Sequence, residues 1–268
     1  MVAFAANSVL CRLALKYTSI DAASFTTVRL VSGAVALWLI VRFQGEGRRV
    51  AGNWVSAFAL FAYAAAFSFA YVTLPTGVGA LLLFGAVQAT MILTGLWRGE
   101  RLGIWQTGGL VVALGGLIIL LSPGLSAPPL VGAILMLTAG MAWGVYSLHG
   151  RGVEDPTDAT AGNFLRAALP AIALSLATVP AAHPDRLGMG YAALSGAITS
   201  GVGYVVWYAA LRGLTATNAA TVQLSAPVLA AFGGVALLGE TMTLRLALAS
   251  LAILGGIALV VRGPRRLR

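Results

Sequence analysis

The sequence predicts an all-α integral membrane protein whose ten transmembrane helices form two inverted five-helix repeats. Three observations predict this fold. Of the 268 residues, 59% are hydrophobic and only 9% are charged, whereas soluble domains carry roughly 25% charged residues. Apolar runs of about 18 residues or more, each long enough to cross a bilayer, recur along the whole chain. The third observation is an internal duplication, which is a sign of repeat architecture.

The duplication is clearest from Gln223 to Val261, where two apolar helices are joined by a short polar break. An earlier copy lies at one constant separation along the chain. The matched positions are Leu74 and Leu214, Ala80 and Ala220, Ala86 and Ala226, Gly99-Glu100 and Gly239-Glu240, and Leu114-Gly115-Gly116 and Leu254-Gly255-Gly256. Because each full repeat holds five helices, an odd number, the second repeat must be inverted in the membrane, as in many secondary transporters.

Each helix is an apolar run bounded by turn residues or charges. In chain order we predict helices at 1–17, 23–42, 53–73, 76–97, 103–121, 128–149, 159–179, 188–211, 216–238 and 243–261. The connectors include Gly45-Glu46-Gly47, Leu74-Pro75-Thr76-Gly77, Ser122-Pro123-Gly124 and the stretch from Pro180 to Pro184. The first repeat is therefore 1–122, the second is 128–262, and 263–268 forms a basic cytoplasmic tail.

The first helix reaches a charge at Arg12, which is early for a membrane span. We therefore expect a native N-terminal extension that completes this helix. A signal peptide is the alternative, although no basic leader or small-residue cleavage site is visible. The single cysteine, Cys11, lies in an apolar run and is interpreted as a packing thiol.

The net charge of +9 lies in the short connectors, where membrane topology explains it better than a nucleic-acid partner. With the first helix starting inside, the cytoplasmic cations are Arg42, Arg48, Arg49, Arg98, Arg101, Arg151, Arg212, Arg262, Arg265, Arg266 and Arg268. The external ones are Lys16, Arg186 and Arg245. This bias predicts that both termini are cytoplasmic.

Three sequence features carry a family resemblance. They are the segment from Ser225-Ala226-Pro227 to Gly239-Glu240, the Leu-Gly-Gly endings of the fifth and tenth helices, and Ala142-Trp143-Gly144 in the sixth. Together they resemble the drug/metabolite transporter superfamily, in its ten-helix class with two EamA-type repeats. The resemblance covers essentially the whole chain and implies export of small organic metabolites. Within the superfamily the chain is most similar to multi-pass exporters of amino acids, particularly aromatic ones, in the bacterial inner membrane.

The two repeats have diverged at positions that matter for a site. Val87 stands in the first repeat where the second has Pro227, and Ala6-Asn7 stands where the second has Trp143-Gly144. A symmetric binding site is therefore not expected.

Polar and aromatic side chains within the helices are the candidates for a central substrate cavity, since polar groups in hydrocarbon tend to face the bundle interior. The predicted substrate-binding residues are Asn7, Tyr63, Gln88, Trp143, Tyr146, Asn163, Tyr204, Tyr208 and Gln223. Aromatic walls suit a substrate with an apolar side chain, and the amides can bond an amino or carboxylate group. For Tyr71 and Trp207, near helix ends, we prefer the role of interface anchors.

Several residues receive structural interpretations. Pro227 breaks the backbone ladder of the ninth helix and is predicted to kink it, and its use as a gating hinge is a hypothesis. Gly115-Gly116 and Gly255-Gly256 are expected to permit close helix contacts. Glu100 and Glu240 precede the fifth and tenth helices, where a negative charge favours the helix N-terminus.

Arg29 and Arg166 match each other in the two repeats, each about two turns into its helix. We expect snorkelling or ion pairing, with contact to a substrate carboxylate as the alternative. The carboxylates, by contrast, all fall in connectors or at helix ends. Because proton pumps commonly use buried acidic relays, we hypothesise gradient-driven export without tight proton coupling.

The competing functions are an exporter of another metabolite or drug, such as a nucleoside or toxic compound, and more remotely an intramembrane enzyme. An enzyme would need convergent acids, histidines or metal ligands, and the sequence offers no catalytic set, so we expect no enzyme, cofactor or metal. A channel is disfavoured because no charged ring or filter-like loop is evident. The expected partners are a small-molecule substrate and the lipid bilayer, without nucleic acid. Since one chain holds both halves, we expect a monomer.

Overall fold

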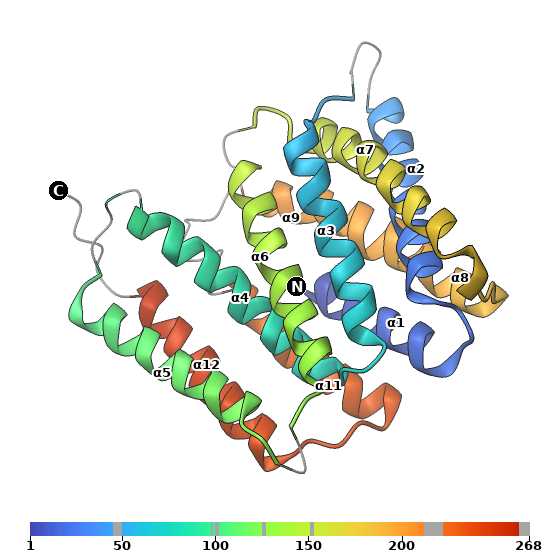
Figure 1. The fold of residues 1–268 in the computed structure, drawn as a ribbon. Coiled ribbons are helices and arrows are strands. Elements are labelled where there is room, and N and C mark those ends of the chain that lie inside the picture. The colour runs from blue at the N-terminus through green and yellow to red at the C-terminus, as the bar shows by residue number, and fades with distance from the viewer. Residues whose placement is uncertain are drawn as a thin grey trace.

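The computed structural model describes residues 1–44, 50–97, 99, 102–124, 127–150, 153–211 and 222–262 of the chain. Within these ranges the regular elements are helices (Figure 1). The predictions for Glu100, for the start of the ninth helix at 216–221 and for the basic tail at 263–268 fall outside them.

The helices follow the predicted order, with their ends shifted by a few residues. They are α1 (Val2–Tyr17), α2 (Ala22–Phe43), α3 (Trp54–Tyr71), α4 (Thr76–Trp97), α5 (Ile104–Leu121), α6 (Leu130–His149), α7 (Pro156–Ala177), the 3-10 turn η1 (Val179–Ala181), α8 (Arg186–Leu194), the π-helical η2 (Ser195–Val202), α9 (Gly203–Leu211), α11 (Ser225–Leu238) and α12 (Leu244–Arg262). In the described part, 8 helical stretches are long and apolar enough to cross a membrane. One of them, Arg186–Ala210, runs through α8, η2 and α9, and α11 is a shorter apolar helix. The predicted all-helical membrane architecture is confirmed at this level.

Side-chain caps at the starts of α2, α3, α7 and α8 satisfy backbone N–H groups that have no partner within the helix. The caps are Asp21, Asn53, Asp155 and Asp185. Asp21 also accepts a hydrogen bond from the backbone N–H of His183 at 3.1 Å. Burial raises the pKa of the Asp21 carboxyl, but hydrogen bonds from Ser24 and His183 outweigh this effect and hold its pKa below the ordinary value.

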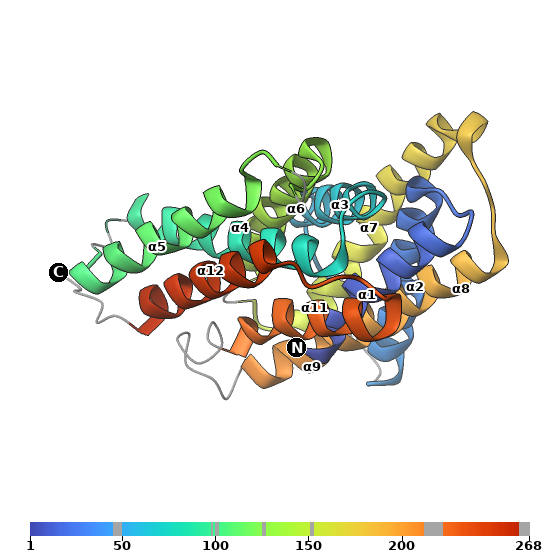
Figure 2. The same ribbon diagram turned by 90° about the horizontal axis from the view of Figure 1, so that it is seen from below.

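Helices from the two halves of the chain pack against each other in pairs. α2 packs on α7, α4 on α11 and α5 on α12. α3 and α4 both contact α6, while α1 contacts α8, η2 and α11. α5 and α12 lie side by side at one edge of the molecule in both views (Figures 1 and 2). Most of the buried core lies between the remaining helices, and α12 adds Leu246, Ala249, Ile253 and Ile257 to it.

Glycine allows the close contact between α5 and α12. A Cβ atom added at Gly256 would lie 2.4 Å from the carbonyl oxygen of Gly109, and one at Gly116 would lie 2.8 Å from a side chain of α12. Gly115 and Gly255 instead have nothing within 4 Å of such a Cβ. The prediction of close helix contacts is therefore confirmed for the second glycine of each pair and wrong for the first.

A second close approach brings η2 onto α2. A Cβ atom at Gly196 would lie 2.0 Å from the carbonyl oxygen of Arg29 and 2.1 Å from the hydroxyl oxygen of Ser32. Glycine is therefore required at this crossing, and it carries the hydroxyl side chains of η2 close to α1 and α2.

Pro227 does not kink the middle of a helix. α11 begins at Ser225 after a turn at Leu224, so Pro227 lies in its first turn, where a missing N–H costs little. The interruption of the predicted ninth helix lies just before Pro227, and a hinge at this point stays a prediction.

Candidate functional site

Trp143 of α6 is the centre of a buried aromatic cluster. Its ring centroid lies 4.9 Å from that of Tyr63 on α3, 4.9 Å from that of Tyr204 on α9 and 5.4 Å from that of Tyr146 on its own helix. Phe4 of α1 also contacts Trp143, at 6.0 Å. Trp143 and the three tyrosines are all buried. Both halves of the chain therefore contribute rings to one buried aromatic cluster.

Asn7 of α1 ties α3 to η2 beside these rings. Its Nδ2 donates to the Tyr63 hydroxyl at 3.3 Å. Its Oδ1 accepts hydrogen bonds from the hydroxyls of Ser195 at 2.6 Å and Thr199 at 3.3 Å. Both hydroxyls belong to the π-helical segment, and such segments within helices are frequent at functional sites.

Arg29 of α2 places a positive charge against the same rings. Its Nη2 donates to the Tyr63 hydroxyl at 3.0 Å and its Nε to Ser200 Oγ at 3.3 Å. Its guanidinium carbon lies 5.0 Å from the ring centre of Tyr63 and 4.9 Å from that of Phe67. The side chain is 1% exposed, and no carboxylate of the described residues pairs with it within 4.0 Å.

Among the described residues Arg29 neither reaches a helix end nor forms an ion pair, so the prediction of snorkelling or ion pairing is wrong for it. Arg166, its counterpart in the second repeat, behaves differently. It donates to backbone carbonyl oxygens of the α2–α3 connector, at 2.7 Å, and of its own helix, at 3.0 Å. This side chain reaches a helix end, as snorkelling predicts.

The other predicted site residues lie at the edge of the cluster or apart from it. Gln88 of α4 donates to Gln223 Oε1 at 3.3 Å, and both amides are buried. Asn163 Oδ1 accepts from the backbone N–H of Asn53 at 3.0 Å, at the start of α3. Tyr208 lines a pocket of about 220 Å³ at the start of α7. The structure thus joins Asn7, Tyr63, Trp143, Tyr146 and Tyr204 and leaves Gln88 and Gln223 outside their contacts. Asn163 and Tyr208 lie at the edge of the cluster, next to Tyr146.

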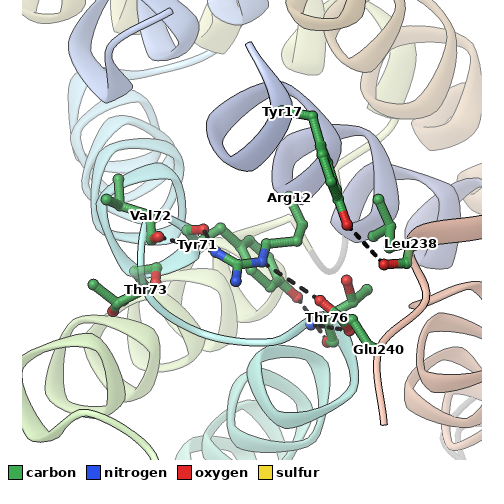
Figure 3. Close-up of polar contacts among 9 residues, drawn as sticks. Arg12, Tyr17, Tyr71, Val72, Thr73, Thr76, Leu238 and Glu240 are labelled. Atoms are coloured by element: carbon green, nitrogen blue, oxygen red, sulfur yellow. Dashed lines mark hydrogen bonds and ion pairs between the residues drawn. The ribbon is translucent and has the colours of Figure 1, made fainter. Parts of the chain in front are cut away.

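A second polar site lies where α1, α3 and α11 end and α4 begins (Figure 3). Arg12 Nε lies 3.5 Å from Glu240 Oε1, and its Nη1 donates to the carbonyl oxygens of Tyr71 at 2.8 Å and Val72 at 2.9 Å. Glu240 Oε2 accepts from the backbone N–H of Thr76 at 2.8 Å. We call these residues the Arg12–Glu240 cluster. Glu240 therefore caps α4, and the prediction that it serves the helix that follows it in sequence is wrong.

Further contacts strengthen this end of the molecule. The Tyr71 hydroxyl donates to the carbonyl oxygen of Thr76 at 3.2 Å, and its ring packs 4.7 Å from that of Phe67. Tyr71 is completely buried, so its prediction as an interface anchor is wrong. The Tyr17 hydroxyl donates to the Leu238 carbonyl oxygen at 2.7 Å (Figure 3). A pocket of about 490 Å³, lined by Arg12 and Glu240 among others, lies beside these contacts.

Sequence reasoning missed part of the central cluster. It omits Ser195, Thr199 and Ser200, and it assigns Arg29 a peripheral role. A signal for the hydroxyls exists in the run Ser-Gly-Ala-Ile-Thr-Ser-Gly, which stands in the middle of an apolar helix. Polar groups at that depth are expected to face the protein interior.

Comparison with known proteins agrees with this architecture. Residues 130–262 match the model of the EamA-like transporter family. An uncharacterised protein of Pseudomonas aeruginosa is 58% identical over 266 residues, covering 99% of this chain and 92% of that protein. The uncharacterised transporter YoaV of Bacillus subtilis is 23% identical, over 87% of this chain and 85% of its own length. An uncharacterised transporter of Archaeoglobus fulgidus is 25% identical, over 71% and 70%.

One crystal structure shares the fold, with a TM-score of 0.69 and 21% identity over 97% of both chains. The chain that contains the buried aromatic and polar cluster is thus similar, along most of its own length, to proteins described as transporters. Residues 130–262 carry an EamA-like transporter domain, and the chain is a multi-pass membrane transporter.

Proposed function

We propose that this transporter exports amino acids with large apolar side chains across a bacterial inner membrane, and that the rings around Trp143 hold the substrate. The observation that carries the proposal is the convergence of Trp143, Tyr63 and Tyr204 from different helices of both halves. Aromatic faces complement an apolar side chain. Asn7 and Arg29 supply polar groups next to those rings. A few polar groups among apolar walls are typical of small-molecule sites.

We further propose that the two halves are inverted repeats, with both termini cytoplasmic and the chain acting as a monomer. The helix contacts support a two-fold relation, because α2–α7, α4–α11 and α5–α12 each join a predicted helix to its counterpart. The contact of α3 with α6 likewise corresponds to that of α1 with α8 and η2. The arginine bias of the connectors supports the orientation.

Alternating access needs contacts that break when one end of the molecule opens, and we assign this role to the Arg12–Glu240 cluster. Arg12 and Thr76 belong to the first half and Glu240 to the second, so the cluster ties the halves together at one end. Pro227, just after the turn at Leu224, is the proposed hinge of α11. Tight proton coupling is not part of the proposal, since the described carboxylates lie at helix ends or in connectors.

Counterflow in proteoliposomes tests this function. Vesicles loaded with one unlabelled amino acid are given the labelled form, using tryptophan, phenylalanine, methionine, threonine, lysine and glutamate in turn. We expect tryptophan and phenylalanine to accumulate, and Trp143→Ala to abolish their accumulation. Trp105→Ala is the matched control, because Trp105 is an exposed tryptophan of α5.

Two outcomes contradict the proposal in different ways. Absence of accumulation for all six amino acids, with folded protein, would indicate another metabolite or a drug as the substrate. Equal transport by the Trp143→Ala and Trp105→Ala variants would place the site elsewhere.

A further inference from the structure

Arg29 carries a buried positive charge whose hydrogen bonding is incomplete. Its Nη1 atom is buried and has no hydrogen-bond partner, and the same holds for the hydroxyl oxygen of Tyr204. A buried polar atom without a partner is unfavourable, and a buried charge without a counter-ion is more so. Such a group needs an explanation in terms of what completes it.

Among the described residues, the groups that contact the guanidinium are neutral. Tyr63 and Ser200 accept one hydrogen bond each, and the faces of Tyr63 and Phe67 supply cation–π contacts. These contacts lower the cost of burying the cation but do not neutralise it. Within the described part of the chain, the one ion pair joins Arg12 to Glu240, so it does not involve Arg29.

The presence of arginine at this position also indicates an anionic partner. Arginine presents five N–H donors in a rigid planar fork, which matches the two oxygens of a carboxylate. Arg29 uses one donor on Nη2 and one on Nε, so the Nη1 end of the fork stays free. Ionisable residues inside a membrane bundle are costly and commonly mark functional sites.

We propose that Arg29 binds the carboxylate of the transported solute, with a second hydrogen bond from the Tyr204 hydroxyl. This inference rests on the proposed function and names the chemical class of its substrate: a carboxylate joined to an apolar, preferably aromatic, side chain. Tyr204 belongs to both parts of the site, because its ring packs on Trp143 while its hydroxyl has no partner. The solute's apolar part lies against these rings, and its carboxylate supplies the missing counter-ion.

Binding of three indole probes to the purified full-length protein tests the assignment. Tryptophan has both ionic groups, 3-indolepropionate has only the carboxylate, and tryptamine has only the amine. We expect the first two to bind about ten-fold or more tightly than tryptamine, as expected for a desolvated charge-assisted contact. Arg29→Gln should reduce the affinity for both carboxylates about ten-fold and leave tryptamine unchanged, while Arg29→Lys should retain part of the difference.

Two further variants keep the test interpretable. Arg166→Gln removes the matching arginine of the second repeat, whose hydrogen bonds in the described part of the chain go to backbone carbonyl oxygens, and should leave all three affinities unchanged. If Arg29→Gln does not fold, Tyr204→Phe takes its place, because it keeps the ring and removes only the hydroxyl. This variant should weaken carboxylate binding several-fold without affecting tryptamine.

The outcomes separate this inference from the proposed function. Equal affinity of the wild-type protein for tryptophan and tryptamine, or equal loss of both on Arg29→Gln, overturns the carboxylate assignment while amino-acid transport stands. Absence of binding for all three probes, together with absence of counterflow, overturns both.

Discussion

Glu240→Gln removes the charge of the Arg12–Glu240 cluster and preserves the size of the side chain. The two side chains are only 10% and 9% exposed, so solvent screens their attraction weakly. Glutamine can still accept from the Thr76 N–H, but it loses the attraction to Arg12 and the negative charge at the α4 N-terminus. A hydrogen bond to a charged group contributes about 1.5–3 kcal/mol, and the helix-end charge about 0.3–1 kcal/mol. We therefore expect the closed arrangement to lose about 2 kcal/mol.

The native cysteine reports this loss. Cys11 is completely buried and adjoins Arg12 on α1, so its alkylation by a maleimide requires this end of the bundle to open. A loss of about 2 kcal/mol corresponds to a roughly 30-fold larger open population, and to an alkylation rate that rises by the same factor. Lys16→Gln is the matched control, because it removes a charge from the wall of the same pocket without touching the ion pair. A Glu240→Gln rate within two-fold of the control would refute the role of the cluster as a closing contact.

Three further predictions concern packing and pH. Gly196→Ala should lower the unfolding free energy by about 1–3 kcal/mol, because the added Cβ would lie 2.0 Å from a carbonyl oxygen of α2. Gly190→Ala is the control and should change thermal stability little, because an added Cβ there has nothing within 4 Å. Equal effects of the two substitutions would contradict the close crossing. Gly256→Val should lower the melting temperature clearly more than Gly255→Val, since only Gly256 contacts α5, and similar melting temperatures would argue against that interface. Folding lowers the pKa of Asp21 from 3.8, so the ionised carboxylate stabilises the fold above that value, and this stability is lost as the pH falls through the folded pKa. Asp21→Asn should therefore lower the melting temperature at pH 7 and reduce the further decrease of the melting temperature in acid. An unchanged acid profile would contradict the prediction.

Local signals predict the helices well, because a membrane span must be long, apolar and bounded by turn residues. The predicted helix at 76–97 coincides with α4, and the one at 23–42 differs from α2 by one residue at each end. What local signals cannot supply is the neighbour that each side chain faces. Gln88 is recognisable as an interior polar residue, but its pairing with Gln223 depends on how α4 packs against the second half.

Arg29 illustrates the same limit for the site. Its depth in the helix is visible in the sequence, whereas the lack of an acidic partner becomes evident only when the surrounding helices are in place. For Glu240, the sequence suggests a partner, but the wrong one. Its position in the sequence suggests a cap for α12, but the chain folds back so that its carboxylate meets the first N–H of α4. Both side chains are thus determined by contacts between segments far apart in sequence.

The π-helical turn η2 has a mechanical consequence. An α-helix advances by roughly 100° per residue, so a change of one residue in the register at η2 would rotate α9 by about that angle relative to α8. Ser195 precedes the possible shift and Tyr204 follows it. One change of winding inside a single span would therefore turn the Tyr204 ring away from Trp143 while Asn7 keeps its hydrogen bond to Ser195. Within the span Arg186–Ala210, such a change would therefore reposition the Tyr204 side of the aromatic cluster while α8 keeps its place.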